Sequence, residues 1–226
     1  MAELILALDL PSDTQAIALV DTLVPQLRWC KVGMEMFTRY GPALIQKLLD
    51  RHLSVFLDLK FYDIPHTVER AVCSARSLGV SMLTLHCQGG ARMLAGAVAA
   101  KEKAATPLLF GVTALTSFGP NEMPGIAKDP SLFASDLADL AATSHLDGIV
   151  CSPKEVPAIK ARHPHLLCLC PGIRPAWACA NDQRRVASPK EAVALGCDYL
   201  VVGRPILEAQ DPKKATALIL DEIALS

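Results

Sequence analysis

Two carboxylates and a lysine stand close together in the segment FLDLKFYD at 56–63. Residues two apart in a strand share a face, so Asp58 and Lys60 are expected to point the same way, and Asp63 follows in a turn fixed by Pro65. Nearby negative charge favours the ammonium form of a lysine. A lysine in that form can donate a proton but is a poor nucleophile, so the spacing indicates acid chemistry rather than a Schiff base.

Further charged residues precede this segment at the ends of two other strand-like runs. Asp9 ends the first run and Lys31 lies near the end of the second. We expect Asp9 and Lys31 to join Asp58, Lys60 and Asp63 in one array of alternating charge at the mouth of a barrel. An ion-pair network that only ties strand ends together is the alternative. We favour a functional array over a stabilising network, because partly buried ion pairs often fail to recover the free energy lost when the charges are desolvated.

A second candidate set lies near the C-terminal end. Gly203 and Arg204 follow the last strand-like run, and Gln183 lies in a loop before it, next to Arg184 and Arg185. Many barrels bind phosphate with the loops after strands seven and eight, where glycine lets backbone N–H groups approach and arginine adds a charged contact. These residues predict a phosphate site, although Gly-Arg-Pro could be only a turn.

Short apolar runs alternate along the whole chain with segments of helical period, which is typical of βα units on a parallel sheet. The expected strands are 4–9, 28–33, 54–60, 80–86, 107–113, 147–152, 166–171 and 198–203. The expected helices are 12–24, 41–51, 65–78, 89–103, 130–144, 153–163, 188–195 and 211–225. Eight such units in 226 residues predict an α/β fold, a (β/α)8 TIM barrel forming a single domain over 1–226. An open doubly wound sheet is the alternative.

Two strand-to-helix connections, 114–129 and 171–187, are longer than usual. Both follow strands, so they lie on the face where barrel enzymes have their active sites. We expect lids or ligand clamps there; tolerated insertions are the alternative.

Composition narrows the kind of ligand. The 22 Lys and Arg residues nearly balance the 23 Asp and Glu residues, so no strong field would attract nucleic acid or an anionic membrane, and a small-molecule substrate is expected. The N-terminal run MAELILALDLPSD has neither a basic n-region nor a span of membrane length, which predicts a cytoplasmic protein. The eight cysteines have no CxxC spacing and are expected to be reduced and mostly buried. Cys168 and Cys170 alone would make a poor zinc site.

Several segments together resemble the orotidine 5′-phosphate decarboxylase family in its bacterial form. They are ALD at 7–9, KVGMEMF at 31–37, GP at 41–42, FLDLKFYDIPHTV at 56–68, TLH at 84–86, VTALTS at 112–117, PGIRP at 171–175, NDQRR at 181–185 and VVGRPI at 201–206. The resemblance implies decarboxylation of orotidine 5′-monophosphate to uridine 5′-monophosphate and CO2 in pyrimidine biosynthesis, with no cofactor and no metal.

The resemblance also implies a role for each matching residue. Lys60 would donate the proton to C6, with Asp58 and Asp63 flanking it and Lys31 ordering the array. The residues expected to bind substrate are Asp9 at a ribose hydroxyl, Lys31, Thr116 at the pyrimidine edge, Arg174 supporting the closing loop, and Gln183, Gly203 and Arg204 at the phosphate. Asp63 and Thr67 would reach into the site of the partner subunit of a homodimer. His86 is expected to be a hydrogen-bonded structural residue near the mouth.

Two other functions stay open. One is a Mg²⁺-dependent sugar-phosphate decarboxylase or aldolase of the same barrel superfamily, which shares the Asp-x-Lys-x-x-Asp spacing of 58–63. The other is a barrel that binds nucleotides as a regulator without turnover. A proton-donating lysine between two carboxylates argues against the regulator, because a protein that only binds nucleotides has no need of a buried acid.

Overall fold

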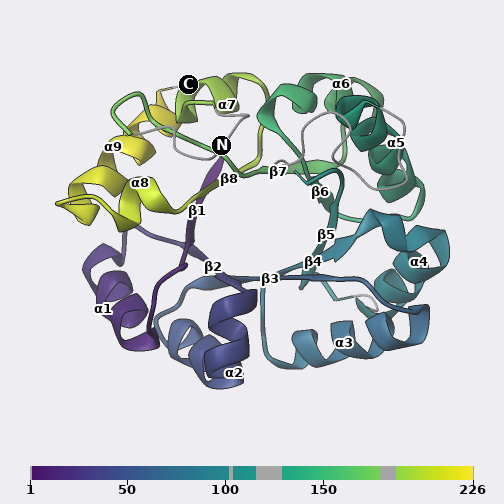
Figure 1. The fold of residues 1–226 in the computed structure, drawn as a ribbon, viewed down its shortest axis with the longest axis horizontal. Helices are drawn as coiled ribbons and strands as arrows, with labels where there is room; N and C mark the ends of the chain where they lie inside the picture. The colour runs from purple at the N-terminus through teal and green to yellow at the C-terminus, as the bar shows by residue number, and fades with distance from the viewer. Residues whose placement is uncertain (1, 102–103, 116–128, 179–186, 226) are drawn as a thin grey trace.

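Eight parallel strands form a closed barrel in chain order, and helices surround it (Figure 1). The computed structural model describes residues 2–101, 104–115, 129–178 and 187–225. The strands are β1 Glu3–Ala7, β2 Trp29–Gly33, β3 Ser54–Phe61, β4 Met82–His86, β5 Leu108–Val112, β6 Gly148–Val150, β7 Leu167–Cys170 and β8 Tyr199–Val202. Because β1 pairs with both β2 and β8, the prediction of a barrel is confirmed and the open sheet is wrong.

Helices follow the strands as the alternating pattern predicts. Their bounds are α1 Asp13–Leu23, α2 Met34–Leu49, α3 Pro65–Ser77, α4 Gly90–Lys101, α5 Pro130–Thr143, α6 Val156–Arg162, α7 Pro189–Ala194, α8 Arg204–Leu207 and α9 Pro212–Ala224. Two short 3₁₀ helices, η1 Cys87–Gly89 and η2 Pro153–Glu155, precede α4 and α6. Local signals set several starts: the Ser12 side chain accepts a hydrogen bond from the backbone N–H of Gln15, and Ser188 and Glu191 form a capping box.

Two helix predictions need correction. Helix α2 begins at Met34, directly after β2, and not at 41; at Gly41 the backbone bends, with φ 55° and ψ −147°. Gly-Pro at 41–42 therefore marks a kink inside the helix rather than its start, because proline cannot donate the backbone hydrogen bond that a straight helix needs there. Helix α8 was not predicted, since its four residues are too few to show a helical period.

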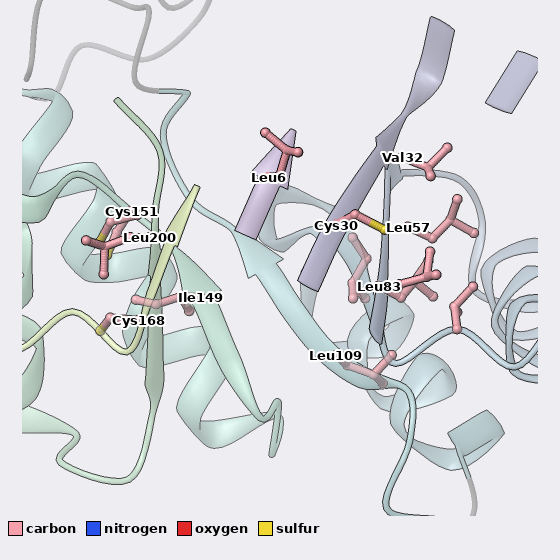
Figure 2. Close-up of a cluster of buried hydrophobic side chains, with 14 of the residues drawn as sticks. Leu6, Cys30, Val32, Leu57, Leu83, Leu109, Ile149, Cys151, Cys168 and Leu200 are labelled. Atoms are coloured by element: carbon pink, nitrogen blue, oxygen red, sulfur yellow. The ribbon is translucent and has the colours of Figure 1, made fainter. Parts of the chain in front are cut away.

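The apolar core has two parts. A large layer between the barrel and the helices contains most of the buried residues, among them Leu6, Val32, Leu83 and Leu200 (Figure 2). A smaller cluster fills the barrel interior: Ile5, Ala7, Phe56, Met82, Phe110, Leu169 and Val201. This interior cluster closes the barrel from within and forms a floor below the C-terminal ends of the strands.

The cysteines of the described ranges agree with the prediction of reduced, mostly buried thiols. Seven are free and six of these are buried, and Cys179 lies outside the described residues. Burial raises the pKa of both the Cys30 and the Cys87 thiol to about 12, so the neutral form is favoured. No helix within the described ranges is long and apolar enough to cross a membrane.

Candidate active site

A pocket of about 560 Å³ opens at the C-terminal ends of the strands. One wall consists of charged side chains from the first three strands, and the opposite wall consists of residues that follow β7 and β8. The residues lining the pocket are Ala7, Asp9, Lys31, Phe56, Asp58, Lys60, Val112, Ala114, Leu115, Val150, Leu169, Pro171, Gly172, Arg174, Val201, Gly203, Arg204, Leu207 and Glu208. The pocket thus has charged sides above an apolar floor.

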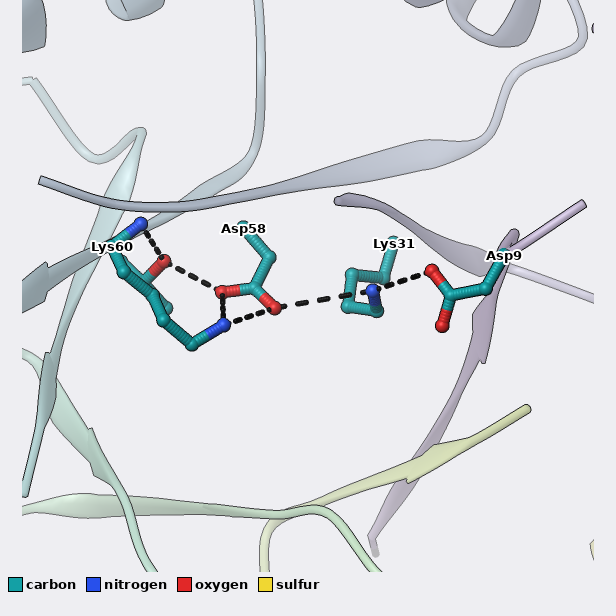
Figure 3. Close-up of polar contacts among 5 residues, drawn as sticks. Asp9, Lys31, Asp58 and Lys60 are labelled. Atoms are coloured by element: carbon teal, nitrogen blue, oxygen red, sulfur yellow. Dashed lines mark hydrogen bonds and ion pairs between the residues drawn. The ribbon is translucent and has the colours of Figure 1, made fainter. Parts of the chain in front are cut away.

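Four of the five predicted charges form a continuous array, and Figure 3 shows them in one row. Lys60 Nζ lies 2.8 Å from both carboxylate oxygens of Asp58. Lys31 Nζ lies 3.0 Å from Asp9 Oδ1 and 3.9 Å from Asp58 Oδ2. The Asp58 carboxylate is therefore held between two ammonium groups.

Burial differs along the array in a way that suits chemistry at its centre. The side chains of Lys31 and Asp58 are 11% and 13% exposed, that of Lys60 is 27% exposed, and that of Asp9 is 59% exposed. Electrostatic interactions strengthen as water is excluded, so the Asp58–Lys60 pair acts more strongly on a ligand than an exposed pair would.

Lys60 contacts Asp58 from an irregular part of β3, and not from the regular strand that the alternation of side chains predicts. Between Leu57 and Phe61 the register of β3 against β4 shifts, and Lys60 has a left-handed backbone with φ 51°. The Lys60 N–H donates to a side chain, Thr84 Oγ1, at 3.0 Å. A lysine in this conformation is strained, and such strain is typical of functional sites.

Asp63 does not join the array, contrary to prediction. It lies beyond the end of β3 on an exposed turn, and its carboxylate accepts a hydrogen bond from the backbone N–H of Ile64 at 2.7 Å. Thr67 is likewise exposed, on the first turn of α3. Asp63 is not among the residues that line the pocket at the mouth of its own barrel, although it lies only three residues from Lys60 in sequence.

The predicted phosphate residues that the structure describes lie together on the opposite wall. Gly203 and Arg204 line the pocket at the end of β8 and the start of α8. Arg174 is also in the lining; it is 9% exposed, and its Nη1 donates to the Ile173 carbonyl at 3.1 Å. Thr116 and Gln183 lie outside the described residues.

His86, at the end of β4, differs from its prediction. Its buried Nδ1 has no hydrogen-bond partner within the described ranges, so the expected hydrogen bond is missing at this atom. Burial is the main reason that the pKa of His86 is lowered, and the positive charge of Lys60 lowers it further, against an opposing effect of Asp58. His86 is therefore held in its neutral form beside the array.

Some residues of the site were missed from sequence. Leu207 and Glu208 line the pocket at the end of α8, the helix that was not predicted, and Thr84 bonds to the array from β4. Alternation along β4 could have indicated Thr84, because it shares a face with Met82 of the barrel interior. The described residues contain no group of three or more His, Cys, Asp or Glu side chains arranged to hold a metal ion.

The geometry agrees with comparisons to known proteins. A curated orotidine 5′-phosphate decarboxylase of Pseudomonas putida (strain GB-1) is 46% identical over 224 residues, covering 97% of this chain and 96% of that protein. The corresponding protein of Pseudomonas paraeruginosa (strain PA7) is also 46% identical, with 97% of each chain covered. The crystal structure of orotidine 5′-phosphate decarboxylase from Lactobacillus acidophilus superposes with a TM-score of 0.86 at 34% identity, covering 99% of each chain. Residues 2–219 match the family model described as orotidine 5′-phosphate decarboxylase / HUMPS, and the chain therefore belongs to this family.

Proposed function

We propose that this protein decarboxylates orotidine 5′-monophosphate to uridine 5′-monophosphate and CO2 without a cofactor, as a step of pyrimidine biosynthesis. The observation that supports this most is the Asp58 carboxylate held between the ammonium groups of Lys60 and Lys31 at the mouth of the barrel. Membership of the family and 46% identity to a curated decarboxylase over nearly the whole chain support the same reaction.

The two walls of the pocket suit the two ends of a nucleotide. On one wall Asp9 accepts a hydrogen bond from a ribose hydroxyl, while Lys31 orders the charges beside it. On the other wall Gly203 and Arg204 hold the phosphate, together with Gln183. The pyrimidine then lies over the apolar floor, with Thr116 at its edge and Arg174 supporting the loop that closes over it.

The chemical step needs no electron sink outside the pocket. The bond between C6 and the carboxylate breaks, CO2 departs, and the electron pair stays on C6 in the plane of the ring. Asp58 lies against the departing carboxylate, which raises the free energy of the bound substrate, and the Lys60 ammonium stabilises the carbanion and transfers a proton to C6. Lys60 recovers its proton from water after product release. Phosphate contacts far from the reacting bond supply the binding energy for this step.

We further propose a homodimer with shared sites. Asp63 and Thr67 are exposed, and the neighbouring Tyr62 and Ile64 are 60% and 67% exposed. An exposed carboxylate between two exposed apolar side chains suits a contact with a second copy of the chain. In such a dimer Asp63 and Thr67 complete the partner's array. A nucleotide substrate made inside the cell also favours the predicted cytoplasmic location.

The direct test is the loss of orotidylate ultraviolet absorbance on addition of the purified protein, with CO2 release measured in parallel. Turnover should persist after treatment with EDTA. Turnover of a sugar phosphate that stops with EDTA would instead support the Mg²⁺-dependent alternative. Stoichiometric nucleotide binding with no release of CO2 would overturn the proposed reaction in favour of a regulatory binder.

A further inference from the structure

A threonine on the strand next to the array bonds to both of its central residues. Thr84 is fully buried on β4, and its Oγ1 donates to Asp58 Oδ1 at 2.8 Å. The same oxygen accepts the backbone N–H of Lys60 at 3.0 Å. A hydroxyl has one proton to donate and can also accept, so one side chain ties the carboxylate of one residue to the backbone of the other.

This bond occurs where the two strands lose their regular pairing. β3 advances four residues, from Leu57 to Phe61, while β4 advances only two, from Leu83 to Leu85. The extra residues of β3 bulge opposite Thr84, and backbone groups in a bulge lack their normal ladder partners. At this irregularity the side chain of Thr84 provides the acceptor for the Lys60 N–H.

The bond bears on the direction of the Lys60 side chain. Lys60 has φ 51°, a conformation that is unfavourable for a residue with a Cβ. Surrounding contacts must hold such a backbone in place, and the Lys60 N–H donates its hydrogen bond to the hydroxyl of Thr84. If Lys60 relaxed to ordinary extended backbone, its ammonium would leave its position 2.8 Å from both oxygens of Asp58.

The surroundings of Thr84 are apolar, so a hydroxyl at this position needs hydrogen-bond partners. Two of its neighbours belong to the apolar interior cluster: Met82, two residues earlier on β4, and Phe110, which pairs with Thr84 on β5. A polar group buried next to such a cluster is costly unless its hydrogen bonds are satisfied. Both bonds of Thr84 go to the array, so the polar atom has its role there and not in the core.

We propose that Thr84 is a positioning residue for the decarboxylation: its hydroxyl holds Lys60 in the left-handed conformation and fixes the orientation of the Asp58 carboxylate, so that the ammonium is set for proton transfer. This rests on the proposed function only for its effect on rate. The effect on the Lys60 backbone can be tested without turnover.

Thr84→Val removes the hydroxyl with little change of shape, and Thr84→Ser keeps it. We expect Thr84→Val to lower kcat by about 10- to 100-fold, because a buried donor and a charged acceptor both lose a partner. KM should change by less than about threefold, because the phosphate contacts lie on the opposite wall. Thr84→Ser should retain kcat within about threefold. Thr84→Ala, which adds no bulk, should behave like Thr84→Val. It replaces Thr84→Val in the test if that variant does not fold.

Thr216→Val is the matched control. Thr216 is also fully buried, but its hydroxyl donates to the Pro212 carbonyl in α9, far along the chain from the array. Its loss should lower thermal stability without lowering kcat. If Thr84→Val or Thr84→Ala keeps kcat within threefold of wild type, or if serine fails to rescue, the proposal is wrong.

Amide hydrogen exchange separates this proposal from the proposed function. The Lys60 amide should exchange at least tenfold faster in Thr84→Val than in wild type, and Thr84→Ser should restore protection. An unchanged Lys60 amide overturns the positioning role whatever the protein catalyses. A different outcome is that the Lys60 amide exchanges faster in Thr84→Val while the wild-type protein does not turn over orotidylate. That outcome would support the backbone role of Thr84 and refute the proposed reaction.

Discussion

Lys60 and Asp58 meet through both oxygens of the carboxylate, each 2.8 Å from the lysine Nζ. Asp58 Oδ1 also accepts the Thr84 hydroxyl, and Oδ2 lies 3.9 Å from Lys31 Nζ. Each oxygen therefore has two partners, and the carboxylate is fixed in orientation before substrate arrives. Preorganisation of this kind is what lets charged groups act on a transition state without first rearranging.

Replacing Lys60 by alanine should abolish turnover while leaving the fold intact. The change removes the proposed acid from a side chain that is partly exposed at the pocket, so kcat should fall at least about 10³-fold with a normal circular dichroism spectrum. Lys47→Ala is the control: Lys47 pairs with Asp13 at 2.8 Å on the outer helices, and its loss should not affect kcat. A Lys60→Ala protein with a tenth of wild-type kcat would refute the assignment of the acid.

Replacing Arg204 by alanine should affect turnover of the nucleotide much more than turnover of the phosphate-free nucleoside. We expect kcat/KM for orotidine 5′-monophosphate to fall about 10²-fold, because a charged contact to phosphate is lost. The kcat/KM for orotidine, which has no phosphate, should change little. Gln183→Ala should behave in the same way. Equal losses on both substrates would mean that these residues act on the ring or on folding.

Mixing two inactive variants tests the shared site. Lys60→Ala and Asp63→Ala homodimers should both be nearly inactive, but a mixed dimer has one site with wild-type Lys60 from one chain and wild-type Asp63 from the other. After dissociation and random reassociation of equal amounts, activity should recover to roughly one quarter of wild type. Mass-tagged chains check that subunits have exchanged. No recovery after confirmed exchange would show that Asp63 serves its own barrel.

The acid dependence of stability should report the environment of His86. Burial and the charge of Lys60 lower its pKa below the ordinary 6.5, so the folded protein favours the neutral ring. The stability that this residue contributes is complete above about pH 6.5 and is lost as pH falls through the folded value. Chemical unfolding between pH 5 and 7.5 should therefore show wild type losing its advantage over His86→Gln on acidification.

The same residue gives a spectroscopic check of the array. In Lys60→Ala, the His86 pKa measured by NMR should rise, because the positive charge that helps to lower it is removed while the opposing effect of Asp58 remains. Lys47→Ala should leave the His86 titration unchanged. An identical titration in wild type and Lys60→Ala would mean that the two groups do not interact.

The sequence alone was sufficient for the alternation of strands and helices and for most of the array. Apolar periodicity and caps such as Ser12 and Ser188 are local signals, and eight short βα units fit a closed barrel. Neighbouring parallel strands end at the same edge of the barrel, which is why the sequence predicts that Asp9, Lys31 and Asp58 meet.

Tertiary structure decided the details that depend on how strands pair. The bulge in β3, the left-handed backbone of Lys60 and its bond to Thr84 follow from the register of β3 against β4, which no local pattern reveals. The turn after β3 likewise removes Asp63 from the array, although it lies only three residues from Lys60. Residue types and spacing thus determine which chemistry is possible here, whereas the pairing of two strands determines which of these side chains meet, because a shift in register redirects every side chain beyond it.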